Sequence, residues 1–369
     1  MADLLSPIWT RPDDRPPSFT PREWEALLGQ ARRAALSARL SLHFLDRGWL
    51  TSVPARARHY LDAALRVVDR QRQAVLWEIE RIDRALQGVR TPVVLLKGAA
   101  YLLCGLAPSR GRLFSDIDIM VDESKLTEVE RALFAAGWIS RERDAYNQRY
   151  YRRWMHEIPP LEHVRRGSII DLHHTIAPPT SRFRVDGAKL IQRARPAISS
   201  RLFVLAPVDM VLHSATHLFQ EGEFDRGLRD LLDVRDLLIE FGKQPLFWPD
   251  LFSRSRELGL CDPLLSALHQ IERLFGSVVP AGSRDDLERL RTGWFPQTLT
   301  SAALRLALRP NHPECDVAGT GIARWLLYVR SHHLRMPVHI LVPHLLRKAY
   351  MRRFPDKGAG TAGQHDQGG

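Results

Sequence analysis

Two aspartates, Asp116 and Asp118, stand two positions apart in the run SDIDIMV. In a β-strand, residues i and i+2 point to the same face, so the two carboxylates would lie side by side. Ile117, Ile119 and Val121 would point to the opposite, apolar face. Two carboxylates held this close repel each other unless a cation lies between them. Hard divalent cations such as Mg²⁺ prefer oxygen ligands of this kind, with phosphate oxygens completing the coordination.

A third acid, Asp171, lies in the apolar run SIIDLH, which also predicts a strand. Three carboxylates from two adjacent strands are what a two-metal phosphoryl-transfer centre requires. One cation activates the attacking hydroxyl, and the other neutralises the leaving phosphate. A strand aspartate can instead pair with an arginine. His173 shares the face of Asp171 and could therefore reach the same site.

Candidate phosphate ligands surround the first of these strands. Lys97 and Gly98 directly follow the apolar run VVLL, and Arg110 and Arg112 lie in a loop with Gly111. An arginine side chain can hold a phosphate through two parallel hydrogen bonds. The alternative for Lys97 is a side chain that reaches solvent, and loop arginines such as Arg110 and Arg112 are commonly only solvated.

These motifs together resemble the nucleotidyltransferase superfamily, in which a glycine after an apolar strand precedes an Asp–apolar–Asp strand and a later lone strand carboxylate. The runs LLKGAA, SDIDIMV and IIDLHHTI are most similar to a bacterial branch called the uncharacterised nucleotidyltransferase family, over about residues 90–240. The resemblance implies that Gly98 is the family's glycine, that Asp116 and Asp118 bind metal, and that Asp171 is the third acid. It also implies Mg²⁺ or Mn²⁺ as cofactor and a nucleoside triphosphate as substrate.

One departure from the superfamily pattern concerns the glycine. Gly98 is followed by Ala99, where well-studied members have serine or glycine, and seventeen residues separate Gly98 from Asp116, a longer spacing than in those members. The bacterial branch shares this longer spacing. A phosphate-binding serine therefore does not carry over, and Lys97 with Arg110 or Arg112 is the candidate replacement.

The periodicity of apolar residues predicts N-terminal helices, then strands that alternate with helices, and then a helical C-terminal part. The resemblance implies an α+β fold with a small mixed-sheet nucleotidyltransferase core and a C-terminal helical domain. Helices are predicted over residues 21–45 and 58–87, and strands over 93–96, 117–121 and 168–173. Further helices are predicted over residues 207–219, 228–241, 248–258, 263–275, around 285–308, and over 321–347. Residues 144–165 fit no clear pattern. The expected domains are an N-terminal irregular segment and helix (1–57), the core with its leading helix (58–206), the helical domain (207–354) and a disordered tail (355–369).

The helical domain carries polar residues that could reach the acids. His213 and His217, four residues apart on one helix, could form a metal pair, although packed histidines are favoured because the glutamate of a zinc-hydrolase motif is missing. Arg229, Asp230 and Asp233 belong to the next helix, where an internal salt bridge is the favoured interpretation. The resemblance implies that this domain closes over the site, so we expect it to form one wall of the cleft.

The composition narrows the class of protein. The chain has 369 residues and a net charge of +11, but only six of its 53 basic residues are lysine, and the arginines are spread along the whole sequence. A nucleic-acid partner therefore stays open but is not favoured. No apolar run approaches the roughly 18 residues of a membrane span. The N-terminus lacks the pattern of a signal peptide, which predicts a cytoplasmic protein.

The C-terminal region is also basic, with a cluster at Arg347, Lys348, Arg352 and Arg353 beside an apolar helix side around residues 341–346. A helix on a membrane surface would fit this pattern, but packing against the helical domain is favoured.

The three cysteines lie far apart, which predicts neither a disulfide framework nor a thiolate zinc site.

The sequence thus predicts an enzyme that transfers a nucleoside monophosphate to an acceptor hydroxyl and releases pyrophosphate. The acceptor can be a small molecule, a protein or a peptide, and a nucleic-acid end stays open. The main alternative is a non-catalytic module that keeps the fold in order to bind a nucleotide or a partner. A helical RNA- or DNA-binding protein is a third hypothesis, for which the sequence contains no recognised binding motif.

Overall fold

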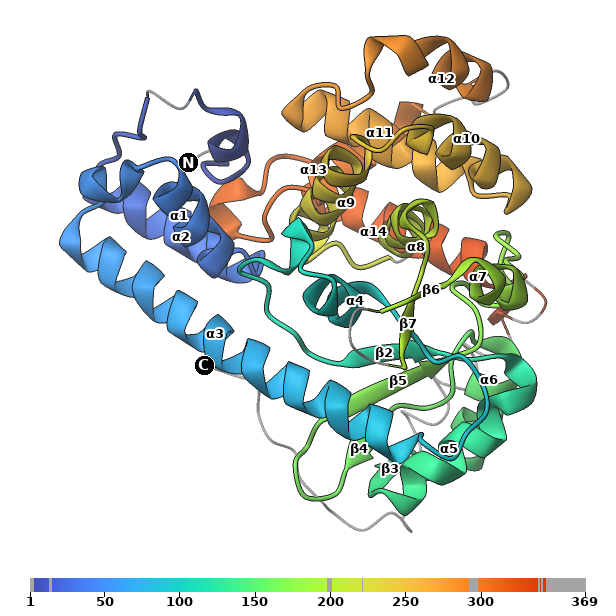
Figure 1. Cartoon of the computed structure of the whole chain (residues 1–369). Helices are drawn as coiled ribbons and strands as arrows, with labels where there is room; N and C mark the ends of the chain where they lie inside the picture. The colour runs from blue at the N-terminus through green and yellow to red at the C-terminus, as the bar shows by residue number, and fades with distance from the viewer. Residues whose placement is uncertain are drawn as a thin grey trace.

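The centre of the fold is a mixed sheet of seven strands in the order β3-β4-β5-β2-β1-β7-β6 (Figure 1). The computed structural model describes residues 3–12, 15–197, 201–220, 222–291, 298–337, 339 and 341–342. The strands are β1 (Val94–Leu95), β2 (Ile117–Met120), β3 (Trp138–Ser140), β4 (Leu161–His163), β5 (Ile169–His173), β6 (Arg195–Pro196) and β7 (Phe203–Val204). The expected α+β fold is confirmed.

The central strands are those whose sequences are almost wholly apolar. All four residues of β2 are buried, and β2 pairs in parallel with β5 and antiparallel with β1. The strands predicted at residues 93–96, 117–121 and 168–173 are confirmed within two residues at either end. Strands β4, β6 and β7 were not predicted. They are only two or three residues long, too short to show an alternating pattern.

Helices α4 (Lys97–Leu103), α5 (Leu126–Ala135), α6 (Ala145–Trp154) and α7 (Gly187–Arg193) lie between the strands. The connection from β1 to β2 runs through α4 and then through a loop at residues 110–116. Helix α6 occupies part of the stretch that fits no sequence pattern, and it has no fully buried residue.

The N-terminal helices are α1 (Pro21–Arg33), α2 (Ser37–Asp46) and α3 (Ala55–Ala85). Thr20 and Glu23 form a capping box that starts α1. The single helix predicted over residues 21–45 was wrong. The chain leaves the helix at Ala35, whose φ is 54°, and Leu36 N donates to Ala31 O, the hydrogen bond that ends many helices.

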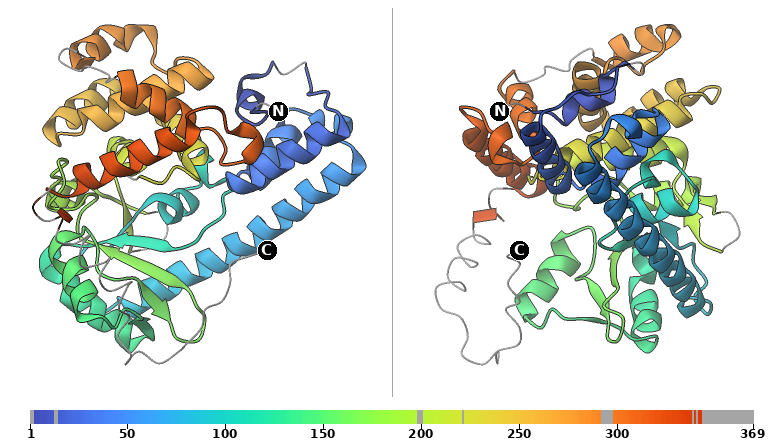
Figure 2. Two further views of the ribbon diagram at one scale, coloured as in Figure 1. Left: turned by 180° about the vertical axis from the view of Figure 1, so that it is seen from behind. Right: turned by 90° about the vertical axis from the view of Figure 1, so that its left-hand side faces the viewer.

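The long helix α3 connects two hydrophobic clusters. Its first half packs Leu61 against the N-terminal helices, and its second half packs Ile79 and Ile82 against the sheet core. In Figure 1 it runs from the N-terminal helices along the sheet to β3 and β4. The N-terminal helices also contact the far end of the chain, since Arg33 Nη1 donates to Asn311 O at 3.3 Å, and Figure 2 shows these parts side by side.

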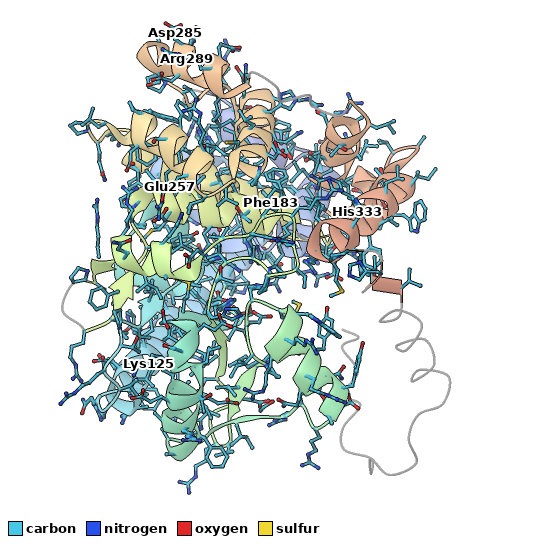
Figure 3. All side chains as sticks on the ribbon, turned by 90° about the vertical axis from the view of Figure 1, so that its right-hand side faces the viewer. Lys125, Phe183, Glu257, Asp285, Arg289 and His333 are labelled. Atoms are coloured by element: carbon cyan, nitrogen blue, oxygen red, sulfur yellow. The ribbon has the colours of Figure 1, made fainter. Side chains whose placement is uncertain are left out.

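The remaining helices form the helical part of the fold, which shares one core with the sheet. Its helices are α8 (Pro207–Gln220), α9 (Gly227–Phe241), α10 (Phe247–Glu257), α11 (Cys261–Phe275), α12 (Arg284–Arg291), α13 (Thr298–Ala307) and α14 (Thr320–Arg335). Helix α8 is buried along almost its whole length and contacts α4, α9, α10, α11 and α14. Figure 3 shows the helical part stacked over the sheet. Asp285 of α12 lies at one end of the molecule, and Lys125, just before α5, lies in the half that contains the sheet.

The helices predicted from residue 207 to residue 275 are confirmed within two residues at either end. The segment predicted over residues 285–308 forms α12 and α13, with residues 292–297 outside the described part. Helix α14 covers the first part of the helix predicted to reach residue 347. The basic cluster at residues 347–353 and the tail at 355–369 lie outside the described residues. Within the described part of the chain, no helix is long and apolar enough to cross a membrane.

Candidate active site

A cleft of about 610 Å³ opens between the sheet and the helical part, and the three predicted acids line it. Asp118 on β2 stands opposite Asp171 on β5 in the parallel register. Directly paired residues of neighbouring strands point to the same face of a sheet, so both carboxylates face the cleft. Asp116 comes just before β2 and reaches the same cleft from the end of the loop.

The carboxylate of Asp118 is buried and surrounded by cationic groups. Its Oδ1 lies 3.2 Å from Nε2 of His173. Burial acts to raise the pKa of Asp118, but Lys97, the hydrogen bond from His173 and the nearby His217 outweigh it and hold the pKa well below its usual range. Asp118 is therefore a permanent anion at neutral pH.

Asp171 has the opposite electrostatic setting. Burial, together with the negative charges of Glu157 and Asp118, raises the pKa of Asp171 to about 7. Its Oδ1 is buried and has no hydrogen-bond partner among the described residues. A buried carboxylate oxygen without a partner is costly, so this atom marks a position where a cation or a polar ligand would be stabilised.

His156, Glu157 and His173 form a compact group beside these acids. Their nearest donor atoms all lie within 4.8 Å of one another, and Glu157 Oε2 lies 3.4 Å from His173 Nε2 and 3.9 Å from His156 Nε2. Burial, and the positive charge of His173 when protonated, lower the pKa of His156 well below its ordinary value, so this imidazole is neutral. The expectation that His173 reaches the site is confirmed.

His156 and Glu157 were missed by the sequence analysis. They follow α6 and are held by a single isolated bridge between Glu157 and His173. A one-residue bridge has no local periodicity, so only the dipeptide His-Glu ahead of a short apolar run could have drawn attention to it.

The predicted phosphate ligands lie in three different environments. Lys97 and Gly98 line the cleft beside the acids. Arg112 also lines it, but its guanidinium forms an ion pair with Asp233 of α9. Arg110 does not reach this cleft. It lies in a separate pocket at the N-terminal helices, where it pairs with Asp46 at 3.0 Å.

Gly98 makes room for the loop that precedes β2. A Cβ atom at this position would lie 3.1 Å from Arg112 Nε and 3.2 Å from Phe114 Cδ1. Lys97 has a φ of 39°, a left-handed conformation that is unfavourable for a residue with a side chain. Such strain persists where the surrounding structure imposes it, and it is frequent at functional sites.

A buried ion network holds the loop of Arg112 in place. Asp233 of α9 pairs with Arg112 and, at 2.8 Å, with Arg39 of α2, while Arg39 also pairs with Asp236. The side chains of Asp233, Arg39 and Arg112 are only 5%, 10% and 11% exposed. The network therefore ties the N-terminal helices, the sheet core and the helical part together next to the cleft.

The helical part forms the opposite wall of the cleft, as predicted. His217, Arg226, Arg229 and Asp230 line it, together with Arg335 at the end of α14. The expected salt bridge is present, since Arg229 Nη2 lies 2.6 Å from Asp230 Oδ1.

His213 is buried in the core and is not among the residues that line the cleft, which agrees with the interpretation of a packed histidine. Arg226 and Arg335 were not predicted as site residues. They lie far from the acids in the sequence, and no local motif marks them.

Comparison with known protein families gives one match. Residues 20–276 match the model of a family described as uncharacterised nucleotidyltransferase. The match covers more of the chain than the 90–240 range of the sequence resemblance, and it includes the N-terminal helices and the helical part through α11. Searches of curated proteins and of solved structures returned no match.

Proposed function

The chain belongs to the uncharacterised nucleotidyltransferase family, and we propose that it transfers a nucleoside monophosphate from a nucleoside triphosphate to an acceptor hydroxyl with the help of a divalent cation. The observation that carries this proposal is the pairing of Asp118 with Asp171 across β2 and β5, with Asp116 beside them in one cleft. The family match by itself supports a transferase only in general terms. The cation, the triphosphate and the roles of the residues are our proposal.

The three acids fit a divalent cation. They supply only oxygen donors, which Mg²⁺ and Mn²⁺ accept. The buried Oδ1 of Asp171 has no hydrogen-bond partner among the described residues, and its carboxylate is close enough to Asp118 and Glu157 for their charges to raise its pKa. Asp116, Asp118 and Asp171 would hold the cation, which when bound supplies positive charge to the phosphate oxygens.

Lys97 is the best-placed side chain to hold the triphosphate, since it lines the cleft beside the acids, and Gly98 next to it leaves room for Arg112 and Phe114 of the loop. Arg226 and Arg335 face the same cleft from the helical part and provide further positive charge. Arg112 has a different role in this proposal. Because its guanidinium is paired with Asp233, it positions the loop between Gly98 and Asp116, and it contacts phosphate only where that pair leaves donors free.

The proposed chemistry is an in-line displacement. The acceptor oxygen attacks the α-phosphorus, the bond from that phosphorus to the bridging oxygen breaks, and pyrophosphate leaves. Asp171 takes the proton of the acceptor hydroxyl, because its carboxylate lies beside Asp118 in the cleft and its pKa is raised to about 7. The positive groups of Lys97 and the arginines stabilise the charge that builds up on the leaving pyrophosphate.

The shape of the cleft suits a nucleotide. Its volume of about 610 Å³ falls within the range of roughly 300 to 1,000 Å³ that is common for small-molecule sites. Phe114, Tyr151 and Met155 line it and offer apolar surface for a base. The acceptor is a small molecule, a protein or a peptide. A nucleic-acid end is not favoured, because no recognised binding motif accompanies the positive charge.

The test is a transfer assay with triphosphates labelled at the α-phosphate, each incubated with the full chain, Mg²⁺ or Mn²⁺, and a cell extract. We expect label on an acceptor species and an equal amount of pyrophosphate. A parallel reaction with γ-labelled triphosphate should put label only on pyrophosphate. Transfer of the γ-label instead would show a kinase, and nucleotide binding without any transfer would favour the non-catalytic alternative.

A further inference from the structure

The group of His156, Glu157 and His173 lies at the edge of the acid cluster, and none of the roles proposed above uses it. Two of its members come from the chain after α6 and one from the end of β5. We propose that these three residues, with Asp118, form a second cation site that binds a transition-metal dication (Mn²⁺, Fe²⁺, Co²⁺ or Zn²⁺) in preference to Mg²⁺.

The distances between the donor atoms fit a shared ion. Nε2 of His173 lies 3.2 Å from Asp118 Oδ1 and 3.4 Å from Glu157 Oε2, and Nε2 of His156 lies 3.9 Å from Glu157 Oε2. Ligands bound about 2.0 to 2.2 Å from one ion lie roughly 3.0 to 3.6 Å apart when they are adjacent. The group therefore needs only small side-chain adjustments to surround an ion.

The backbone holds these residues rigidly. Glu157 forms a β-bridge with His173. On either side of that bridge, Ile158 N donates to Leu172 O at 3.0 Å, and His174 N donates to His156 O at 2.9 Å. A site whose backbone is fixed in advance loses less conformational freedom when it binds its ion.

Buried polar atoms provide a second observation. His173 is only 2% exposed, and its Nδ1 has no hydrogen-bond partner among the described residues. Nδ1 of His156 is likewise buried without a partner in that part of the chain. Burying two imidazoles with incomplete hydrogen bonding is costly, and the Nε2 atoms of the same two rings are the ones that lie toward Glu157.

The donor types decide the metal class. Mg²⁺ prefers oxygen ligands, and the three aspartates already offer them. Imidazole nitrogens with carboxylates instead favour divalent transition metals, whose affinities rise from Mn²⁺ through Fe²⁺ and Co²⁺. The cleft thus has an all-oxygen subsite at Asp116 and Asp171 and a mixed nitrogen–oxygen subsite at the histidines, with Asp118 between them.

The role of this second site rests on the proposed function, because it would place a further positive charge beside the reacting phosphate. The existence of the second site does not depend on the proposed function, since the binding of the metal alone can be measured. The experiment is a titration of the untagged, metal-free full chain with Co²⁺, in which binding is measured by calorimetry and by visible absorption. A matched calorimetric titration is made with Mg²⁺. Failure of transfer with intact Co²⁺ binding would count against the proposed function alone.

The variants are Glu157→Gln and His156→Asn, neither of which is fully buried, with His333→Asn as control. His333 is exposed at the end of α14 and contacts Arg182 (Figure 3). We expect the wild type and the control to bind Co²⁺ at least about tenfold more tightly than Mg²⁺. His156→Asn should weaken Co²⁺ binding by about tenfold or more and leave Mg²⁺ binding unchanged, and Glu157→Gln should also weaken Co²⁺ binding.

Two results would overturn the proposal. One is Co²⁺ binding no tighter than Mg²⁺ binding in the wild type. The other is Co²⁺ affinity that is the same in His156→Asn and Glu157→Gln as in His333→Asn, because the ion would then be held by the aspartates alone. Far-UV circular dichroism of each variant checks that the fold is retained, so that a loss of binding reports on the ligands.

Discussion

Replacing Asp233 by asparagine tests the idea that a buried ion network holds the active-site loop. The substitution keeps the shape of the side chain but removes the charge shared by Arg39 and Arg112. Removing one partner of a buried ion pair costs about 3–5 kcal/mol, since the other charge stays buried without compensation. Arg39 keeps its pair with Asp236, so the unpaired charge is mainly that of Arg112. We therefore expect a loss near the lower limit, about 3 kcal/mol.

The assay is urea unfolding at neutral pH, with Asp286→Asn as the matched control. Asp286 forms an ion pair with Arg289 on α12, where the side chains are 38% and 72% exposed, and such surface pairs contribute about 0–1 kcal/mol. The double variant Asp233→Asn/Arg112→Met should recover part of the lost stability, because it removes the uncompensated charge. A loss below about 1 kcal/mol in Asp233→Asn, equal to that of the surface control, would refute the reasoning.

The remaining predictions concern the loop, the pH dependence of stability and the core. In urea unfolding, Gly111→Ala should lower the free energy of unfolding by about 1–3 kcal/mol more than Gly105→Ala. Both glycines have a positive φ, but only at Gly111 would a Cβ atom lie 2.6 Å from a backbone atom, the nitrogen of Arg39. Equal losses of stability in the two variants would contradict this prediction. Burial and the charge of Arg47 lower the pKa of His43 to about 4, whereas in the unfolded chain it is about 6.5, so the unfolded state takes up a proton first and stability should fall as the pH drops from about 6.5 toward 4. His43→Gln should reduce the slope of the urea midpoint between pH 7 and pH 5, and an unchanged slope would assign the pH dependence to other groups. Deleting residues 207–369 should leave an insoluble core without nucleotide affinity, because the sheet and the helical part share one hydrophobic cluster; a soluble, nucleotide-binding core would show that the helical part serves another purpose.

The parts of the site that the sequence predicted are those that local patterns encode. Asp118 and Asp171 lie in apolar strands, and the alternation of a strand is enough to place their side chains on one face. Gly98 could also be predicted as a site residue, because Lys97 and Gly98 directly follow the apolar run that forms β1.

The parts that could not be predicted depend on contacts between distant segments. Arg112 has the residue type of a phosphate ligand, but its partner Asp233 is 121 positions away, and the competition between phosphate and Asp233 is not visible in the local sequence. Glu157 reaches the site through one isolated bridge. The left-handed Ala35 that divides the first predicted helix gives no signal either, because alanine is a strong helix former.

The central claim is that the acids of the cleft support nucleotidyl transfer, and the most direct test compares Asp118→Asn with Asp122→Asn in the α-label transfer assay at saturating Mg²⁺. Asp122 is a partly exposed aspartate that caps a short helical turn after β2 and does not line the cleft. We predict that Asp118→Asn abolishes transfer and keeps the fold, with stability below that of the wild type, because Lys97 and His173 lose the anion that they stabilise. Asp122→Asn should transfer label at the wild-type rate. Equal turnover in Asp118→Asn and the wild type would contradict the account.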